Sequence, residues 1–274
     1  MSDEFYVKSN VRDYRVVFED WETSIGDILK DGDFVILDSQ ISRLYPKTKE
    51  LNCSKIFITA SESSKSYDSI GKVMTELLER GFSRNNKLIA IGGGVTQDVT
   101  SFAASVLMRG VEWVFYPTNL LSQGDSCIGS KTSVNLGVFK NQIGGFYPPS
   151  TVFIDTRFCS SLTSRDICSG LGELAHYILV DGSTPINDLS VLIEEAKSDL
   201  VARESLIKKS LLIKKTMIEI DEFDQGPRCV FNYGHTFGHA IEASTNYEVP
   251  HGVAVAYGMD LANVISVEFN LVDK

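Results

Sequence analysis

Three of the chain's four histidines, His235, His239 and His251, fall within seventeen residues of one another. In a helix, His235 and His239 lie one turn apart on the same face, and His251 can fold back toward them after a turn at Pro250. Neutral imidazole is a favoured zinc ligand, and a carboxylate often completes such a set. The spacing therefore favours a metal site; the alternative is a histidine pair that merely caps or packs a helix.

The composition is that of an ordinary globular protein, with 43% hydrophobic and 23% charged residues among 274. No apolar stretch approaches the roughly 20 residues that span a bilayer, and the N-terminus MSDEFYVKSN lacks the apolar core of a signal peptide. We therefore expect a cytoplasmic protein with no membrane partner. A net charge of −10 argues against nucleic-acid binding, which requires clustered lysine and arginine. The five cysteines include no Cys-x-x-Cys pair, so no thiolate zinc cluster is expected.

Hydrophobic patterns divide the chain into two parts. The first part alternates β-rich runs with helical patterns, which predicts parallel strands at 15–18, 33–38, 55–60, 88–92 and 113–118 and a crossover helix over 70–78 that ends near Gly81. Beyond about residue 160, helical patterns occur at 168–180, 185–196, 201–221, 233–244 and 252–270. We predict a Rossmann-like α/β nucleotide-binding domain over 1–158 and an all-α metal-binding domain over 159–274, with the site in the cleft between them.

The predicted strand 88–92 runs directly into the segment Gly92-Gly93-Gly94-Val95-Thr96-Gln97-Asp98, and a helical pattern follows. Glycines let the backbone approach a pyrophosphate, and a helix N-terminus offers free N–H groups to it. The three consecutive glycines differ from the usual Rossmann fingerprint. The segment therefore favours nucleotide binding, with a tight structural turn as the alternative.

Several motifs, in this order and spacing, resemble the dehydroquinate synthase family of sugar phosphate cyclases: GGGVTQD, RGVEWVFYPTNLLSQGDSCIGSKTSVN, FKNQIGGFYPP, GLGE, and FNYGHTFGHAIE with a later HG. The resemblance extends from about Asp38 to the end of the chain. It implies an N-terminal α/β domain that binds NAD and a Zn²⁺ or Co²⁺ ion held against a C-terminal helical domain.

Carried over residue by residue, the resemblance implies that the metal ligands are Glu173, His235 and His251. It implies that NAD contacts come from Asp38, Glu62, Lys65, Gly93, Gly94, Asp98, Thr118, Asn119, Lys131 and Lys140. The implied substrate contacts are Lys131, Lys140, Asn141, Lys214, Arg228 and His239, with Arg109 reaching a neighbouring subunit's site. The residues expected to take part in catalysis are Asp125, Lys131, His176, Lys214, Arg228, Asn232 and His239.

The activity implied by the resemblance is that of a phosphate-eliminating lyase. It would convert 3-deoxy-arabino-heptulosonate 7-phosphate into 3-dehydroquinate and phosphate, a step of the shikimate pathway to the aromatic amino acids. Transient oxidation by NAD, phosphate elimination, reduction and an intramolecular aldol addition follow one another, so no net oxidation occurs. Cationic and amide side chains would neutralise the phosphate and the substrate carboxylate. A homodimer is also implied.

Two departures from the family bear on the substrate. His176 stands three residues after Glu173, where the family usually has a lysine. We expect it to contact a substrate hydroxyl, with a role as an additional metal ligand or as a core residue as alternatives. The chain also ends at Lys274, before helices that contribute another phosphate-binding lysine in the family. It is either a fragment or a short member that closes its site with a partner subunit.

Three other functions remain as alternatives. Lys214 and Arg228 match the positions that bind the substrate carboxylate in the family, which favours an acidic sugar phosphate, but His176 leaves open a neutral one such as sedoheptulose 7-phosphate or glucose 6-phosphate. A metal-dependent polyol dehydrogenase would release free NADH and needs no such anion pocket. A non-catalytic relative would bind nucleotide only and no metal.

Overall fold

The computed structural model describes residues 3–273, which form two compact units. The first contains the residues up to Thr118 together with Ser126–Asp155, and the second contains Asn119–Asp125 and the residues from Thr156 onward. The chain therefore passes between the units more than once, and the short segment Asn119–Asp125 belongs to the helical unit. The single boundary after residue 158 stays a prediction.

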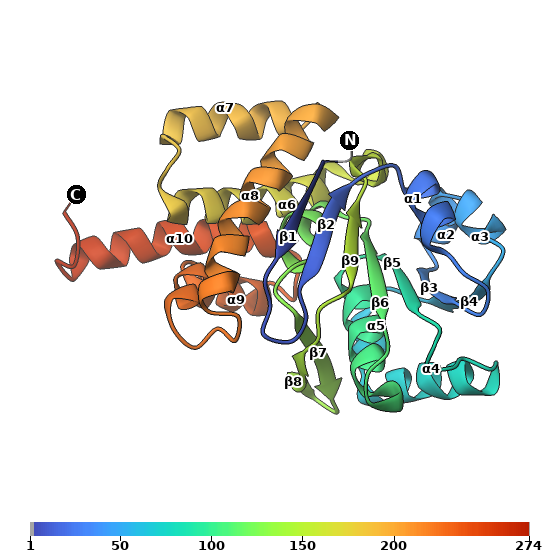
Figure 1. Ribbon diagram of the computed structural model, residues 1–274. Helices are drawn as coiled ribbons and strands as arrows, with labels where there is room; N and C mark the ends of the chain where they lie inside the picture. Colours follow the sequence, from blue (N-terminus) through green and yellow to red (C-terminus); the bar gives the residue numbers. More distant parts are fainter. Residues whose placement is uncertain (1–2, 274) are drawn as a thin grey trace. The chain divides into compact units, whose positions relative to one another are not determined.

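The first unit is built on a seven-stranded sheet of order β1-β2-β9-β6-β5-β3-β4 (Figure 1). Its strands are β1 (Asp3–Val7), β2 (Tyr14–Phe18), β3 (Phe34–Asp38), β4 (Ser54–Ile58), β5 (Leu88–Gly92), β6 (Trp113–Pro117) and β9 (Thr151–Ile154). Neighbouring strands run parallel except for β1, which pairs antiparallel with β2. Every residue of β3, β5 and β6 is buried, as a parallel sheet covered on both faces requires. The predicted α/β fold class is confirmed.

The helices of the first unit are α1 (Trp21–Ile28), α2 (Ile41–Leu44), α3 (Lys47–Glu50), α4 (Tyr67–Glu79) and α5 (Gly94–Val106). Helix α4 connects the parallel strands β4 and β5 on either side of β3, which confirms the predicted crossover helix. It ends just before Gly81, whose φ of +85° favours glycine. Helix α5 follows β5 directly and packs against β5 and β6. Strand β5 and helix α5 together therefore place the glycine-rich segment at the carboxyl edge of the sheet.

A separate antiparallel hairpin joins β7 (Lys131–Leu136) to β8 (Phe139–Phe146). Lys131 pairs with Phe146 at its base, and Leu136 pairs with Phe139 at its tip. These strands were not predicted, because β8 is mostly exposed and carries polar residues and two glycines in place of an apolar alternation. The hairpin is held by contacts with α5 and with the 3-10 turn Glu62–Lys65.

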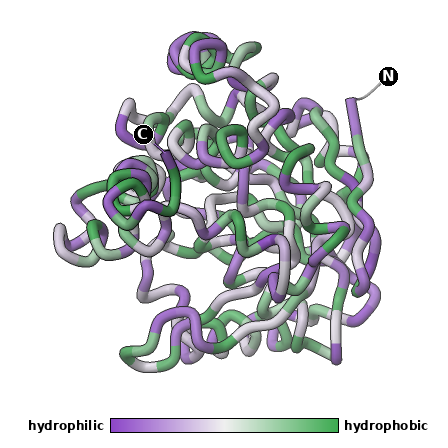
Figure 2. The backbone as a smooth tube through the Cα atoms, turned by 90° about the vertical axis from the view of Figure 1, so that its left-hand side faces the viewer, coloured by the Kyte–Doolittle hydropathy of each residue, from purple (hydrophilic) through white to green (hydrophobic). Residues whose placement is uncertain are grey.

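The second unit contains α6 (Ser164–Asp181), α7 (Ile186–Ala196), α8 (Leu200–Ile220), α9 (His235–Ser244) and α10 (His251–Glu268). These helices lie within a few residues of the predicted ranges. Their packing buries Leu174 and Ile178 of α6 with Leu206, Ile207 and Leu211 of α8. Among residues 3–273, no helix is long and apolar enough to cross a membrane. In Figure 2, hydrophilic positions, drawn in purple, interrupt the hydrophobic green ones along the helices.

Candidate functional site

The predicted metal ligands come together within the second unit. Glu173 lies in the middle of α6, and His235 and His251 are the first residues of α9 and α10. Oε1 of Glu173 is 3.9 Å from Nε2 of His235, and Oε2 is 3.6 Å from Nε2 of His251. Ligand atoms around one zinc ion lie about 3.3 Å apart, since each is about 2.0–2.1 Å from the metal. A small inward movement would therefore suit a single ion.

A buried and unpartnered oxygen supports this assignment. Glu173 is 2% exposed, and its Oε2 has no hydrogen-bond partner among the described residues. A buried carboxylate without a partner is unfavourable, so a cation at this point would satisfy it. Burial also lowers the pKa of His235, although the Glu173 carboxylate opposes this shift. The neutral imidazole that a metal requires is thereby favoured. The residues fit a divalent metal ion.

Two further contacts orient the histidine ligands. Nδ1 of His251 lies 3.2 Å from Oε2 of Glu242, and Nδ1 of His235 lies 3.4 Å from the backbone carbonyl of Tyr233. Metal-binding histidines usually donate their second ring N–H to a carboxylate or carbonyl in this way. Glu242 was not among the predicted site residues. Its position seven residues, or two helical turns, after His235 is the signal that would have indicated it.

Close backbone packing brings the ligands together. A Cβ atom on Gly172 would lie 2.2 Å from the carbonyl oxygen of Gly252, and one on Gly252 would lie 1.8 Å from the carbonyl oxygen of Ser169. Helices α6 and α10 therefore meet at a point where no side chain fits. Because Glu173 and His251 are the immediate sequence neighbours of these glycines, the same contact brings the carboxylate beside the imidazole.

The two other histidines of the chain, His239 and His176, differ in solvent exposure. His239 is exposed on α9, and its ring centroid is 5.5 Å from that of His235 and 5.8 Å from that of His251. With Glu242 and His251 it forms a second set of ligand atoms within 4.8 Å of one another. His176 is 0% exposed, with Nδ1 3.7 Å from Oε1 of Glu173.

A buried ion pair joins two of the other predicted catalytic residues. Nζ of Lys214 on α8 lies 2.6 Å from Oδ1 of Asp125 and donates to its backbone carbonyl at 2.7 Å. Tyr177, which sequence reasoning missed although it follows His176, donates its hydroxyl proton to the same carboxylate. Burial alone would raise the pKa of Asp125, but the Lys214 ammonium and these hydrogen bonds outweigh it and hold the pKa below its ordinary value. Asp125 therefore stays ionised.

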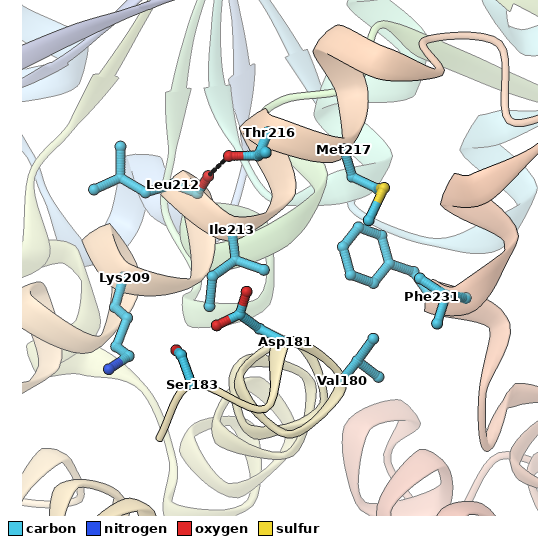
Figure 3. A pocket seen from close by; sticks show the side chains of 10 residues that line it. Val180, Asp181, Ser183, Lys209, Leu212, Ile213, Thr216, Met217 and Phe231 are labelled. Atoms are coloured by element: carbon cyan, nitrogen blue, oxygen red, sulfur yellow. Dashed lines mark hydrogen bonds between the residues drawn. The ribbon is translucent and has the colours of Figure 1, made fainter.

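Arg228 and Asn232 have different surroundings. Arg228 is 5% exposed, and its Nη1 donates to the backbone carbonyl of Glu222 at 2.6 Å. Asn232 is exposed and lines an apolar cavity of about 700 Å³ with Leu179 and Met259. A second cavity of about 440 Å³ lies against α8, and Figure 3 shows its mainly apolar lining. No metal-ligand candidate lines either cavity.

Several of the predicted nucleotide contacts lie in the first unit at the carboxyl ends of its central strands. Strand β5 ends at Gly92, and α5 begins at Gly94, with Gly93 as its N-cap residue. A Cβ on Gly92 would lie 2.2 Å from Oγ1 of Thr96, so the turn requires glycine there. Thr118 follows β6 and donates its N–H to the carbonyl of Gly92 at 3.0 Å. Asp38 ends the neighbouring strand β3. This edge is where open α/β sheets bind dinucleotides.

A network of polar side chains continues from this edge to the hairpin. Lys65 pairs with Asp98 at 2.8 Å and donates to Oδ1 of Asn141 at 2.8 Å. Asn135, which was not predicted, donates to Oε1 of Glu62 at 2.7 Å and accepts from the N–H of Asn141 at 2.9 Å. Burial raises the pKa of Asp98 to about 6 against the opposing charge of Lys65. The network thus brings together four of the predicted residues.

The remaining predicted residues are more scattered. Lys131 begins β7 at the base of the hairpin, whereas Lys140 lies near its tip, and both are exposed. Lys131 is four positions before Asn135 on β7, or roughly 13 Å away at 3.3 Å per residue. Arg109 is exposed in the 3-10 turn Leu107–Arg109 with a positive φ of 66°. Asn119 belongs to the second unit, where its Oδ1 accepts the N–H of Ser122 at 2.8 Å.

Comparison with known protein families gives consistent matches along the chain. A family model described as 3-dehydroquinate synthase N-terminal matches residues 55–169, and one described as 3-dehydroquinate synthase C-terminal matches residues 170–274. The 3-dehydroquinate synthase of Pelagibacter ubique (strain HTCC1062) is 42% identical over 230 residues, which cover 79% of this chain and 62% of that protein. That of Caldanaerobacter subterraneus subsp. tengcongensis is 35% identical over an alignment of 292 positions, which covers 99% of this chain and 81% of that protein.

Among solved structures, a 2-deoxy-scyllo-inosose synthase complexed with carbaglucose-6-phosphate, NAD⁺ and Co²⁺ has a similar fold. The TM-score is 0.85 and the sequence identity 26%, over 99% of this chain and 77% of that one. This chain spans less than two thirds of the length of the Pelagibacter ubique relative.

Proposed function

Because this chain belongs to the 3-dehydroquinate synthase family, as its motifs predicted, we propose that it is an NAD- and metal-dependent sugar phosphate cyclase. Its reaction would convert 3-deoxy-arabino-heptulosonate 7-phosphate into 3-dehydroquinate and phosphate, a step of the shikimate pathway. The cluster of Glu173, His235 and His251 carries the proposal. Two histidines and one carboxylate hold a metal ion and leave a position open for a substrate, as catalytic sites require.

Residues of both units support NAD and a metal ion as the cofactors. The 2-deoxy-scyllo-inosose synthase that shares this fold holds NAD⁺ and Co²⁺, which supports NAD with Zn²⁺ or Co²⁺ here. When bound, NAD accepts and returns a hydride, and the metal ion polarises an oxygen as a Lewis acid. In the first unit, the N-terminus of α5 offers backbone N–H groups to a pyrophosphate, and Asp38 ends β3 where a ribose hydroxyl is commonly held.

The side chains of the protein would hold the anionic substrate and move protons. His239 is the exposed imidazole beside the metal-ligand candidates, and it would bind the substrate phosphate or transfer a proton. Lys131, Lys140 and Arg109 are exposed cations suited to phosphate. Asp125, fixed by Lys214 and Tyr177, presents a carboxylate whose lowered pKa keeps it an acceptor at neutral pH.

The test is release of inorganic phosphate by purified protein supplied with NAD and Zn²⁺ or Co²⁺. The candidate substrates are 3-deoxy-arabino-heptulosonate 7-phosphate, sedoheptulose 7-phosphate and glucose 6-phosphate, with NADH absorbance followed in parallel. Phosphate release from the first substrate without lasting NADH supports the proposal. Accumulation of NADH in proportion to turnover would instead identify a polyol dehydrogenase, and nucleotide binding without metal binding would identify a non-catalytic relative.

A cyclase that acts on a neutral sugar phosphate is the second candidate, and specific contacts favour it. Lys214 and Arg228 are the residues expected to bind a substrate carboxylate, yet each is buried and donates to the protein itself, to Asp125 and to the Glu222 carbonyl. His176 also replaces a lysine expected from the family. Phosphate release from sedoheptulose 7-phosphate or glucose 6-phosphate, but not from the acidic substrate, would select this candidate.

The cytoplasmic location and the homodimer implied by the family stay predictions. Light scattering after size-exclusion chromatography would measure the mass in solution against the 30.3 kDa of one chain. If Arg109 reaches a neighbouring subunit's site, Arg109→Ala should lower turnover and leave the measured mass unchanged. The side chain is exposed on a short 3-10 turn, so its loss should not disturb the fold.

A further inference from the structure

His176 is the most unusual buried polar group of the second unit. Its ring is 0% exposed, and neither Nδ1 nor Nε2 has a hydrogen-bond partner among the described residues. An imidazole always carries at least one N–H donor, and burying a donor without an acceptor is unfavourable. A histidine retained under these conditions is expected to gain a partner in the functional state of the protein.

The surroundings of His176 restrict that partner. Aromatic rings surround it, with centroids 5.3 Å away for Tyr177, 6.4 Å for Phe231 and 5.2 Å for His235. These edge-to-face contacts hold the ring by packing alone. The charged group facing it is Glu173, whose Oε1 lies 3.7 Å from Nδ1, somewhat beyond hydrogen-bond length. Both residues lie on α6, three positions apart and therefore on one helix face.

Glu173 is itself incompletely satisfied, and its two oxygens face different groups. Oε2 has no hydrogen-bond partner and lies 3.6 Å from Nε2 of His251. Oε1 lies between Nδ1 of His176 at 3.7 Å and Nε2 of His235 at 3.9 Å. A small rotation of the carboxylate would bring Oε1 within hydrogen-bond distance of His176.

We propose that His176 is a positioning residue that donates Nδ1–H to Oε1 of Glu173 and thereby orients this carboxylate toward the metal ion. The inference rests on the metal site of the proposed function and adds a residue to it. Ligating carboxylates are commonly held by such a hydrogen bond, and loss of the partner weakens metal binding. An imidazole N–H can orient Oε1 of Glu173 in this way and leave the other carboxylate oxygen for the metal ion.

Two other roles fit less well. As a fourth metal ligand, His176 would have to join the set of Glu173, His235 and His251, but the ligand atoms within 4.8 Å of one another do not include its nitrogens. A fourth protein ligand would also fill the position that a catalytic site leaves open. As a contact to a substrate hydroxyl, it would need an exposed edge, and the ring has none in this structure.

Four substitutions of His176 separate these roles. His176→Asn places an amide near the position of Nδ1, His176→Gln places one near Nε2, His176→Leu removes every donor, and His176→Lys introduces a charge. Metal affinity is measured on the full chain by competition of Co²⁺ with a chromophoric chelator, and the visible absorption of bound Co²⁺ reports its ligand geometry. Circular dichroism of the metal-free variants checks that each one folds.

We expect His176→Leu to bind Co²⁺ about 10- to 100-fold more weakly, with a changed absorption band, and His176→Asn to recover most of the affinity. His176→Gln should recover less, and His176→Lys, which keeps an N–H donor and restores the residue usual in the family, should retain metal binding. Wild-type affinity in folded His176→Leu would overturn the proposal, as would equal loss in the Asn, Gln and Leu variants. Glu173→Gln and His235→Ala provide the control. If these two variants keep wild-type Co²⁺ affinity, the metal site itself is wrong. If they lose affinity while His176→Leu keeps it, only the role of His176 is wrong.

Discussion

Oε2 of Glu242 lies 3.2 Å from Nδ1 of His251, whose other nitrogen, Nε2, faces Oε2 of Glu173 across 3.6 Å. One imidazole thus bridges two carboxylates that come from different helices, α9 and α6. If Glu242 accepts the Nδ1 proton, Nε2 is left with a lone pair for a metal ion, which is the usual arrangement of a carboxylate, a histidine and zinc.

We therefore predict that Glu242→Ala weakens Zn²⁺ or Co²⁺ binding about 10- to 100-fold, because His251 loses the partner that fixes its ring and tautomer. Glu242→Gln, which retains a hydrogen-bond acceptor, should lose less. Competition with a chelator measures both affinities. Glu195→Ala on α7 serves as a control, because it removes a carboxylate of the same unit outside the cluster. Equal affinity of the Glu242→Ala and control variants would contradict the prediction.

A second prediction concerns the contact of α6 with α10. Gly172→Ala would place a methyl group 2.2 Å from the backbone oxygen of Gly252, which no side-chain rotation relieves. Overpacking of this kind costs about 1–3 kcal/mol, and the displaced helix would carry His251 away from Glu173. We expect both the thermal midpoint and the Co²⁺ affinity to fall.

Gly71→Ala on α4 is the matched control, because a Cβ there has nothing within 4 Å. Alanine is the better helix former by up to about 1 kcal/mol, so this variant should be as stable as the wild type or more so. If Gly172→Ala were equally harmless and bound Co²⁺ normally, the close approach of the two helices would not be needed to assemble the site.

The elements that the sequence predicted well are those whose signal is local. Buried strands β3, β5 and β6 read as continuous apolar runs, and the helices of the second unit repeat at helical spacing. His235 and His251 stood out because histidine is rare in this chain. Glu173, by contrast, was assigned only through the GLGE motif and the family resemblance, because nothing near it in sequence shows that α6 faces α9 and α10.

What the sequence did not predict depends on packing between distant segments. Asn119–Asp125 lies between α/β residues in the chain, yet it joins the helical unit because Asp125 pairs with Lys214, 89 positions away. Hairpin β7–β8 has no apolar alternation, and side-chain hydrogen bonds such as that of Asn135 to Glu62 hold it. Glu242 lies two helical turns after His235, which places it on the same helix face, but only its contact with His251 shows which histidine it holds.

A third prediction uses Asp98, whose pKa burial raises to about 6 despite its ion pair with Lys65. The folded-state pKa lies above the ordinary unfolded value of about 3.9, so the folded protein binds this proton more readily. The contribution of Asp98 to stability is therefore unfavourable above pH 6 and is relieved as the pH falls from 6 to 4. The effect is at most about 3 kcal/mol.

Urea unfolding from pH 4 to 8, followed by tryptophan fluorescence, measures this effect, because both tryptophans, Trp21 and Trp113, lie in the first unit. Asp98→Asn removes the titrating group, and its one amide oxygen can still accept the N–H of Ser133. The difference in unfolding free energy between wild type and variant should change between pH 4 and 6 and level off above. A constant difference across this range would show that the pKa of Asp98 is not raised.

The last prediction concerns the buried pair of Lys214 and Asp125, whose side chains are 6% and 20% exposed. Lys214→Met leaves the Asp125 carboxylate buried without its cation, which typically costs about 3–5 kcal/mol. Lys214 holds the pKa of Asp125 below its ordinary value. The pair therefore stabilises the fold at pH values above the ordinary pKa of an aspartate, and this stabilisation is lost as the pH falls through the lowered pKa of Asp125. The single variant should therefore be most destabilised near neutral pH.

Asp125→Asn combined with Lys214→Met tests whether the charge, and not the lost packing, is responsible. The double variant should be more stable than Lys214→Met alone, because no unpaired charge remains and Tyr177 can still donate to the amide oxygen. Thermal unfolding followed by circular dichroism reports on the helical second unit. If both variants lose the same stability, the ion pair contributes little. Lys214 then acts through the packing of its aliphatic stem or through the contact of its Nζ, 5.6 Å from the centre of the Tyr177 ring.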